Sequence, residues 1–270
     1  MWAVAYILAA ATLWSTIGVA SVLGGDIVVM AFVRSLIAGV VGLLIARSFK
    51  RSSLIAGVLL GVLFSSYPLS AVIAGVGVAA YLLYTAPLWA TLASLAYGEK
   101  PGVTGVASIA LILVAVALMG LEAGRGALDA AGLASGLIAG VSYGLYIAVA
   151  RFYSRRGESL EVSLGAMPYT LTVTLPMMIA YATVNRSLEL QPNPVIAGAY
   201  LAVLATIIPY KLFTRGVEKV GASRASVIAS IEPVLAAIWG LMLFHQTPTI
   251  TILTAYILIT TAVVITAAKS

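Results

Sequence analysis

Very few charged side chains lie inside the long apolar runs of this 270-residue sequence. Glu232 lies about ten residues, or roughly 15 Å, into an apolar run at 1.5 Å per helical residue. An ionised carboxylate at that depth in a membrane is expensive unless it is paired or hydrated. Glu232 therefore predicts a binding site for a substrate amine or a proton. A hydrogen-bonded glutamate that locks two helices together is the alternative.

Two basic residues, Arg34 and Lys211, also lie within apolar runs. The Arg34 guanidinium is always charged and forks well onto carboxylates. It could bind a substrate carboxylate or pair with Glu232, and snorkelling towards the nearer interface is the alternative. Lys211 follows Pro209 by two residues, nearer the edge of its run, where snorkelling is the preferred interpretation. Facing inward, Lys211 would be a second partner for Glu232.

Aromatic side chains lie within the apolar runs and not only at their ends. Tyr81 and Tyr84 are three residues apart and are expected to share a helix face, as are Tyr143 and Tyr146. Together with Trp14, they suit a mostly apolar cavity with a few polar anchors, and their π faces attract cations. Ordinary helix packing is the alternative for each residue alone. We predict a cavity lining for the group, because interfacial aromatics should lie at span ends.

Four prolines occur inside the runs and are predicted to shape gating helices. Pro233, next to Glu232, also removes a backbone donor and can leave nearby carbonyls free to bind a ligand. A simple packing kink is the alternative. These residues are Pro68, Pro87, Pro209 and Pro233.

The composition indicates what kind of molecule must position these residues. Hydrophobic residues make up 62% of the chain and charged residues 9%, against about 25% charged in an ordinary soluble domain. This excludes a soluble enzyme, a disordered protein and a nucleic-acid binder, and leaves an all-α polytopic membrane protein in the lipid bilayer. The absence of cysteine excludes disulfides and thiolate metal sites, and no metal or cofactor is predicted.

Charges, prolines and glycines divide the chain into ten apolar runs. Each run is about 20 residues long, the length of a transmembrane helix. The third and fourth runs are separated only by Gly75-Val76-Gly77. The predicted spans are Trp2–Leu23, Ile27–Ala46, Leu54–Ile73, Val78–Tyr97, Val103–Leu121, Ala131–Ala150, Val162–Thr183, Val195–Thr214, Ala222–Phe244 and Thr249–Ala268.

The basic residues predict the orientation of these spans. With both termini on one side, twelve of the 15 Lys and Arg residues fall in the loops of that side. Arg125 and Arg186 fall in the other loops, and Arg34 lies inside a span. By the positive-inside rule, the first side is cytoplasmic. We therefore expect a multi-pass protein of the plasma membrane with cytoplasmic N- and C-termini.

A weak internal repeat relates the two halves of the chain. Pro68 and Pro209 are each followed seven residues later by Gly-Val, and the segment YTAPL at 84–88 parallels SIEPV at 230–234. Chance similarity between Ala/Val/Leu-rich segments is the alternative.

The repeat predicts two five-helix units, residues 1–125 and 126–270. Because five is odd, the two units must have opposite orientations in the membrane. Inverted repeats are typical of secondary transporters, in which two related halves rock around a central site.

These motifs, in this order and with ten spans, resemble the EamA-like type of the drug/metabolite transporter superfamily over nearly the whole chain. The resemblance implies two inverted five-helix repeats, a central cavity, and alternating access for small metabolites, often the export of amino acids or related compounds. The family usually has Gly-Glu near the end of the ninth helix, where this chain has Phe244-His245-Gln246. The motifs are Trp14-Ser15, Arg34, Ala86-Pro87-Leu88 before Glu99, and Gly221-Ala222-Ser223 leading to Ile231-Glu232-Pro233-Val234.

The sequence thus predicts a secondary active transporter for a small metabolite, an amino acid or related compound, moved by alternating access in the export direction. No Walker A motif is present to drive it by ATP. A coupling proton or a counter-substrate, and a monomer or a homodimer, are the open choices. A channel or lipid-handling protein is one alternative, although no filter is recognisable. An intramembrane enzyme is the other, but the single histidine, His245, lies at a helix end with no nucleophile beside it.

Overall fold

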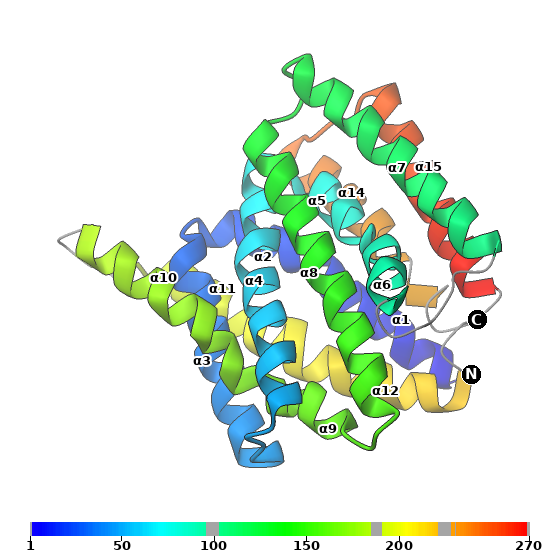
Figure 1. Ribbon diagram of the computed structural model, residues 1–270. Helices are drawn as coiled ribbons and strands as arrows, with labels where there is room; N and C mark the ends of the chain where they lie inside the picture. The colour runs from blue at the N-terminus through cyan, green and yellow to red at the C-terminus, as the bar shows by residue number, and fades with distance from the viewer. Residues whose placement is uncertain (1, 96–102, 185–190, 221–227, 230, 269–270) are drawn as a thin grey trace.

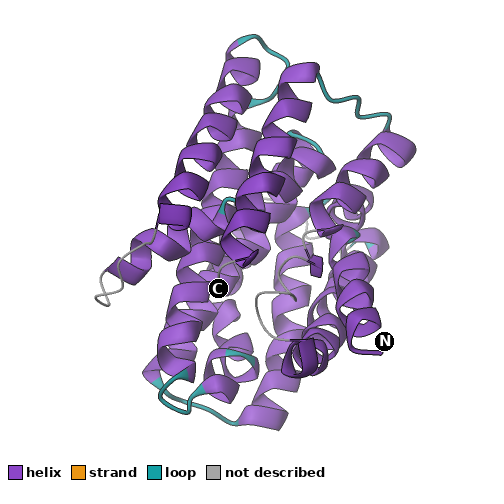
Figure 2. Cartoon of the chain, turned by 90° about the vertical axis from the view of Figure 1, so that its right-hand side faces the viewer, coloured by secondary structure: helices purple, strands orange, loops and turns teal. Residues whose placement is uncertain are grey.

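The computed structural model describes residues 2–95, 103–184, 191–220, 228–229 and 231–268. Throughout these ranges the regular elements are helices joined by short turns (Figures 1 and 2). In chain order they are α1 (Trp2–Ser15), α2 (Ile17–Gly24), α3 (Ile27–Ala46), α4 (Arg51–Ile73), α5 (Val76–Leu83), α6 (Ala86–Leu95), α7 (Val103–Gly124), α8 (Ala130–Ser154), α9 (Ser159–Val162), η1 (Leu164–Thr170), α10 (Leu171–Val184), α11 (Pro192–Ala202), η2 (Val203–Ile207), α12 (Ile208–Val220), α14 (Ile231–Phe244) and α15 (Ile250–Ala268).

These helices confirm the all-α polytopic membrane fold with ten spans. In the described part of the chain, eight helices or joined helix segments are long and apolar enough to cross a membrane, and α14 and α15 are two shorter apolar helices. The predicted division between the third and fourth spans is confirmed, because α4 ends at Ile73 and α5 begins at Val76. Gly75, between these two helices, has a φ of +104°, which glycine adopts more easily than residues with a side chain.

Several spans are interrupted where the hydropathy pattern predicts continuous helices. The first span breaks at Thr16, whose hydroxyl and backbone N–H both donate to the Leu13 carbonyl. The fourth breaks at Tyr84-Thr85, where the Thr85 hydroxyl donates to the Leu82 carbonyl. Hydroxyl side chains compete in this way with the helical hydrogen-bond ladder. In the eighth span, α11 and α12 are joined by the π-helical turn η2.

The four prolines fall at different places in these helices. Pro68 lies inside the continuous helix α4, and Pro209 lies just after η2 in α12. Pro87 and Pro233 lie in the first turns of α6 and α14. A missing backbone donor costs little at a helix start. The two prolines of the repeated motif therefore begin helices and do not kink them.

The bundle places segments far apart in the sequence side by side. Helix α4 packs on α8 and η1, α3 packs on η1 and α11, and α1 packs on α12. Helices α7 and α15 form a pair at one edge of the bundle, green and red in Figure 1. One buried core cluster lies among the first four spans and their counterparts in the second half, and another joins α5 to α7 and α15.

Glycines allow these helices to approach closely. On α8, Gly140 and Gly144 face the carbonyl groups of Leu82 and Ala86, which end α5 and begin α6. On α4, Gly57 faces the backbone carbonyl of Ala166 in η1. A stripe of small residues is the usual means by which membrane helices pack closely.

Adding a single methyl group at Gly57 should test this packing. A Cβ atom there would overlap the Ala166 carbonyl and the Tyr169 side chain, so Gly57→Ala is expected to destabilise the protein by about 1–3 kcal/mol. Gly120 on α7 is the control, because nothing lies within 4 Å of a Cβ atom added there. Thermal unfolding in detergent measures both variants. Equal melting temperatures would contradict the close contact.

Candidate functional site

Glu232 lies in the first turn of α14 and is only 5% exposed. The Tyr84 hydroxyl donates to Glu232 Oε2 at 2.9 Å and also contacts the Ala229 carbonyl at 3.0 Å. Tyr84 stands at the break between α5 and α6. The carboxylate is therefore held where the fourth span is interrupted, in the interior of an apolar bundle.

Arg34 lies in the middle of α3 and is also only 5% exposed. Its Nε donates to the Thr206 hydroxyl at 3.0 Å, and its guanidinium carbon lies 3.7 Å from the centre of the Phe64 ring. The Thr206 hydroxyl in turn donates to the Leu201 carbonyl at 2.9 Å within the π-helical turn. Such turns are frequent at functional sites because they re-aim side chains.

Arg34 and Glu232 do not form an ion pair with each other. Ion pairs in the described part of the chain include Lys50–Glu161 and Arg125–Glu122. The interior thus contains an acid and a base that are hydrogen-bonded to neutral groups. Such an arrangement leaves each charge available to a ligand of the opposite sign.

Tyr67 on α4 lies within electrostatic range of both Arg34 and Glu232. Its side chain is 2% exposed, and its hydroxyl has no hydrogen-bond partner in the described part of the chain. A buried hydroxyl without a partner is costly and calls for an explanation. The Tyr67 hydroxyl is therefore an unused hydrogen-bonding group near both buried charges.

The aromatic residues extend this cluster. The Trp14 ring contacts Tyr210 and Phe213 at centroid distances of 5.6 and 5.3 Å. Tyr143 and Tyr146 stack at 6.3 Å. Tyr143 and Tyr210 both interact electrostatically with Glu232, and Tyr146 interacts with Tyr210. The structure thus brings most of the sequence-predicted site residues together, namely Trp14, Arg34, Tyr84, Tyr143, Tyr146 and Glu232.

Two predicted site residues lie elsewhere. Tyr81 stacks on Tyr256 of α15 at a centroid distance of 3.8 Å and lies in the buried cluster against which Tyr84 also packs. The backbone N–H of Tyr84 still donates to the Ala80 carbonyl, so the two tyrosines keep the predicted helical spacing, but the Tyr84 hydroxyl reaches Glu232 while Tyr81 lies against α15. Lys211 is exposed on α12, as the snorkelling interpretation expects.

Four residues of the cluster were missed by sequence reasoning: Phe64, Tyr67, Thr206 and Tyr210. The adjacent prolines carried a signal for two of them, because Tyr67 precedes Pro68 and Tyr210 follows Pro209. No sequence signal marked Thr206, because the direction of its side chain depends on the π-helical turn.

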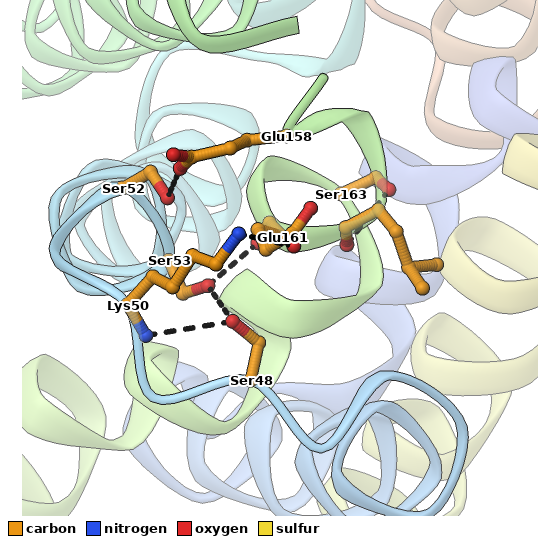
Figure 3. A network of polar contacts seen from close by, with 8 residues as sticks. Ser48, Lys50, Ser52, Ser53, Glu158, Glu161 and Ser163 are labelled. Atoms are coloured by element: carbon orange, nitrogen blue, oxygen red, sulfur yellow. Dashed lines mark hydrogen bonds and ion pairs between the residues drawn. The ribbon is translucent and has the colours of Figure 1, made fainter. Parts of the chain in front are cut away.

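A second polar cluster joins the two halves near the start of α4 (Figure 3). The Ser52 hydroxyl donates to Glu158, and the Ser53 hydroxyl donates to the Glu161 carbonyl at 3.0 Å. Lys50 forms an ion pair with Glu161 at 2.8 Å. The hydrogen bond from Lys50 to Glu161 raises the pKa of the Lys50 ammonium. The ion pair is therefore charged at neutral pH, and it is lost as the pH rises through the raised pKa of Lys50 or falls through the lowered pKa of Glu161.

The interior cluster offers binding groups and no evident catalytic set. It contains one carboxylate, one guanidinium and several phenolic hydroxyls. In the described ranges, no three His, Asp or Glu side chains come close enough together to hold a metal ion.

The architecture is that of a multi-pass membrane protein. The model of the EamA-like transporter family matches residues 130–268. The chain belongs to this family.

Two curated relatives carry transporter names. An "Uncharacterized transporter" of Archaeoglobus fulgidus is 26% identical over 176 residues, which cover 65% of this chain and 61% of the relative. The "Uncharacterized transporter YdfC" of Bacillus subtilis is 28% identical over 180 residues, which cover 64% of this chain and 56% of the relative. The matches thus span less than two thirds of these relatives.

A solved crystal structure shares the fold over nearly the full length. It superposes with a TM-score of 0.58 at 20% identity, covering 98% of this chain and 96% of the other.

Proposed function

We propose that this protein is a secondary active transporter that exports a small amphoteric metabolite, an amino acid or a related compound, by alternating access. In this proposal it lies in the plasma membrane with both termini in the cytoplasm. This orientation is supported by exposed basic residues in loops and at helix ends on the predicted side of the N-terminus. They are Arg47, Lys50, Arg51, Arg155 and Arg156.

The contacts between helices support two inverted repeats, residues 1–125 and 126–270. The third span (α4) packs on the sixth (α8), and correspondingly the eighth (α11 and α12) packs on the first (α2 and α1). The third also packs on the seventh (η1 and α10), as the eighth packs on the second (α3). A half-turn that exchanges the two halves would generate these matched pairs.

Three pairs would map onto themselves under the same half-turn. These are the second span with the seventh, the fourth with the ninth, and the fifth with the tenth. All three are in contact, through α3 and η1, α5 and α14, and α7 and α15. Two halves packed in this reciprocal way can rock about a shared central site.

The observation that carries the proposal is the pair of buried, separately held charges. Arg34 and Glu232 have opposite signs, and neither is neutralised by the other. An amino acid would place its carboxylate on Arg34, where the guanidinium fork fits it, and its ammonium on Glu232 and the nearby π faces. Tyr67 would donate its free hydroxyl to the same ligand.

Alternating access requires closures that can open in turn. The cluster of Ser52, Ser53, Glu158 and Glu161 with Lys50 joins the two halves at the proposed cytoplasmic end. Breaking these contacts would let the halves separate there. The helix starts at Pro87 and Pro233 would supply the joints of the gating spans.

Replacing Tyr67 by Phe tests the site without disturbing the fold. Because the Tyr67 hydroxyl is buried with no partner within the described residues, its loss should keep or slightly raise the melting temperature of the free protein. Removing one ligand hydrogen bond of about 1 kcal/mol should weaken substrate binding about fivefold. A thermal-shift screen of metabolites on purified protein identifies the ligand, and counterflow in liposomes measures its transport.

Ser35→Ala is the matched control for this variant. Ser35 carries the other buried hydroxyl without a partner in the described ranges, one residue after Arg34 on α3. Its loss should change neither stability nor binding. If Tyr67→Phe binds and transports the ligand like the wild type, the substrate does not lie between Arg34 and Glu232.

A further inference from the structure

A second cavity lies between α2 and α11, apart from the residues of the central cluster. Its volume is about 500 Å³, within the roughly 300–1,000 Å³ of known small-molecule sites. Its wall is mainly apolar, formed by Val19, Ala20, Leu23, Ile196 and Ala197. None of the described residues that line it is charged. An uncharged, apolar occupant fits this lining.

Two polar groups at the inner end of the cavity satisfy each other. The hydroxyls of Thr16 and Tyr200 are hydrogen-bonded at 2.7 Å. Thr16 is about eight residues, or roughly 12 Å, below the end of α2. Tyr200 packs on the same core cluster as Trp14 and Tyr67. The pair of hydroxyls therefore separates the cavity from the central site.

The rim of the cavity faces the bilayer. Leu23 and Ile196 line it and are each 65% exposed, so both side chains contact lipid in a membrane-spanning bundle. Asn193 is the polar residue at the outer end, where α11 begins. An apolar cavity of roughly 150 Å³ already binds benzene. The present cavity is larger and opens onto lipid, so lipid acyl chains are the most abundant apolar groups beside it.

We propose that this cavity binds one acyl chain of a membrane lipid, inserted between α2 and α11, with the lipid headgroup near Asn193. The two helices belong to different halves of the chain and pack directly on each other beside the cavity, so the bound acyl chain would lie along the contact between the halves. If the cavity narrows when the halves rock, lipid binding favours the state in which it is open. The inference rests on the membrane fold and not on the proposed substrate.

Filling the cavity with protein should remove this lipid. Ala20→Phe places a ring in the cavity from α2, and Val203→Phe places the same ring on the exposed side of the eighth span, outside the lining. Native mass spectrometry of protein purified in mild detergent counts the retained lipids. We expect one fewer lipid on Ala20→Phe than on the wild type and on Val203→Phe. Equal counts on all three would overturn the proposal.

A fluorescent probe tests the same site without filling it. The chain has no cysteine, so Ile196→Cys and Val203→Cys can each be labelled singly and reconstituted with lipids brominated along one acyl chain. A bound chain should quench the probe at position 196 at a several-fold lower fraction of brominated lipid than the probe at position 203. Identical quenching curves mean ordinary surrounding lipid only and would contradict a bound chain. A substrate-induced thermal shift, measured separately, shows whether the transport proposal holds.

Discussion

Replacing Glu232 by Gln is expected to reduce transport about 10- to 100-fold and to abolish its pH dependence. The amide has nearly the same shape and can still accept the hydrogen bond from Tyr84, but it carries no charge. Hydrogen bonds to charged groups contribute about 1.5–3 kcal/mol, which corresponds to that range of rates. Counterflow in liposomes at several pH values measures the rate and its pH profile together.

Glu122→Gln is the matched control. Glu122 is 3% exposed, but it lies near the end of α7, where it accepts hydrogen bonds from Thr249 and Arg125 at 2.9 Å each. This variant should retain the wild-type rate and pH profile. An undiminished and equally pH-dependent rate in Glu232→Gln would remove Glu232 from both proposed roles. An equal loss in both variants would indicate a general need for buried carboxylates.

The fold could be predicted because hydropathy and span length determine most of it. The predicted span Ile27–Ala46 coincides with α3, which Asp26 caps by accepting hydrogen bonds from the backbone N–H groups of Val28 and Val29. The breaks could not be predicted. The interruption at Thr16 depends on a hydroxyl that bonds to Leu13 and to Tyr200 of another span. Hydropathy contains no information on such tertiary partners.

The site was predictable where a residue type is costly in its surroundings. Glu232 and Arg34 stand out in apolar runs because burying a charge needs a reason. Tyr67 did not stand out, since tyrosine is common in membrane helices and only packing leaves its hydroxyl unpartnered. Helical spacing correctly placed Tyr81 beside Tyr84 on one buried cluster, but it could not tell that Tyr81 stacks on Tyr256 while the Tyr84 hydroxyl reaches Glu232.

Arg34→Gln is expected to weaken the binding of an amino acid more than the binding of its decarboxylated amine. Removing one partner of a buried charge pair costs about 2–5 kcal/mol, or at least tenfold in affinity. The amine has no carboxylate to lose, so its affinity should change less than about threefold. The hydroxyl of Thr206 remains bonded to the Leu201 carbonyl without Arg34. The fold should therefore survive, as the melting temperature would verify.

The reciprocal pattern should hold at the other charge. Glu232→Gln should weaken the binding of the amino acid more than the binding of its deaminated acid, because only the amino acid carries an ammonium group. Arg47→Gln, at the exposed end of the same helix α3, should affect no ligand. Isothermal titration of the three ligands against the three variants gives the coupling between each charge and each ligand group. A uniform loss for all ligands in Arg34→Gln would mean that Arg34 supports the architecture of the cavity and does not touch the substrate.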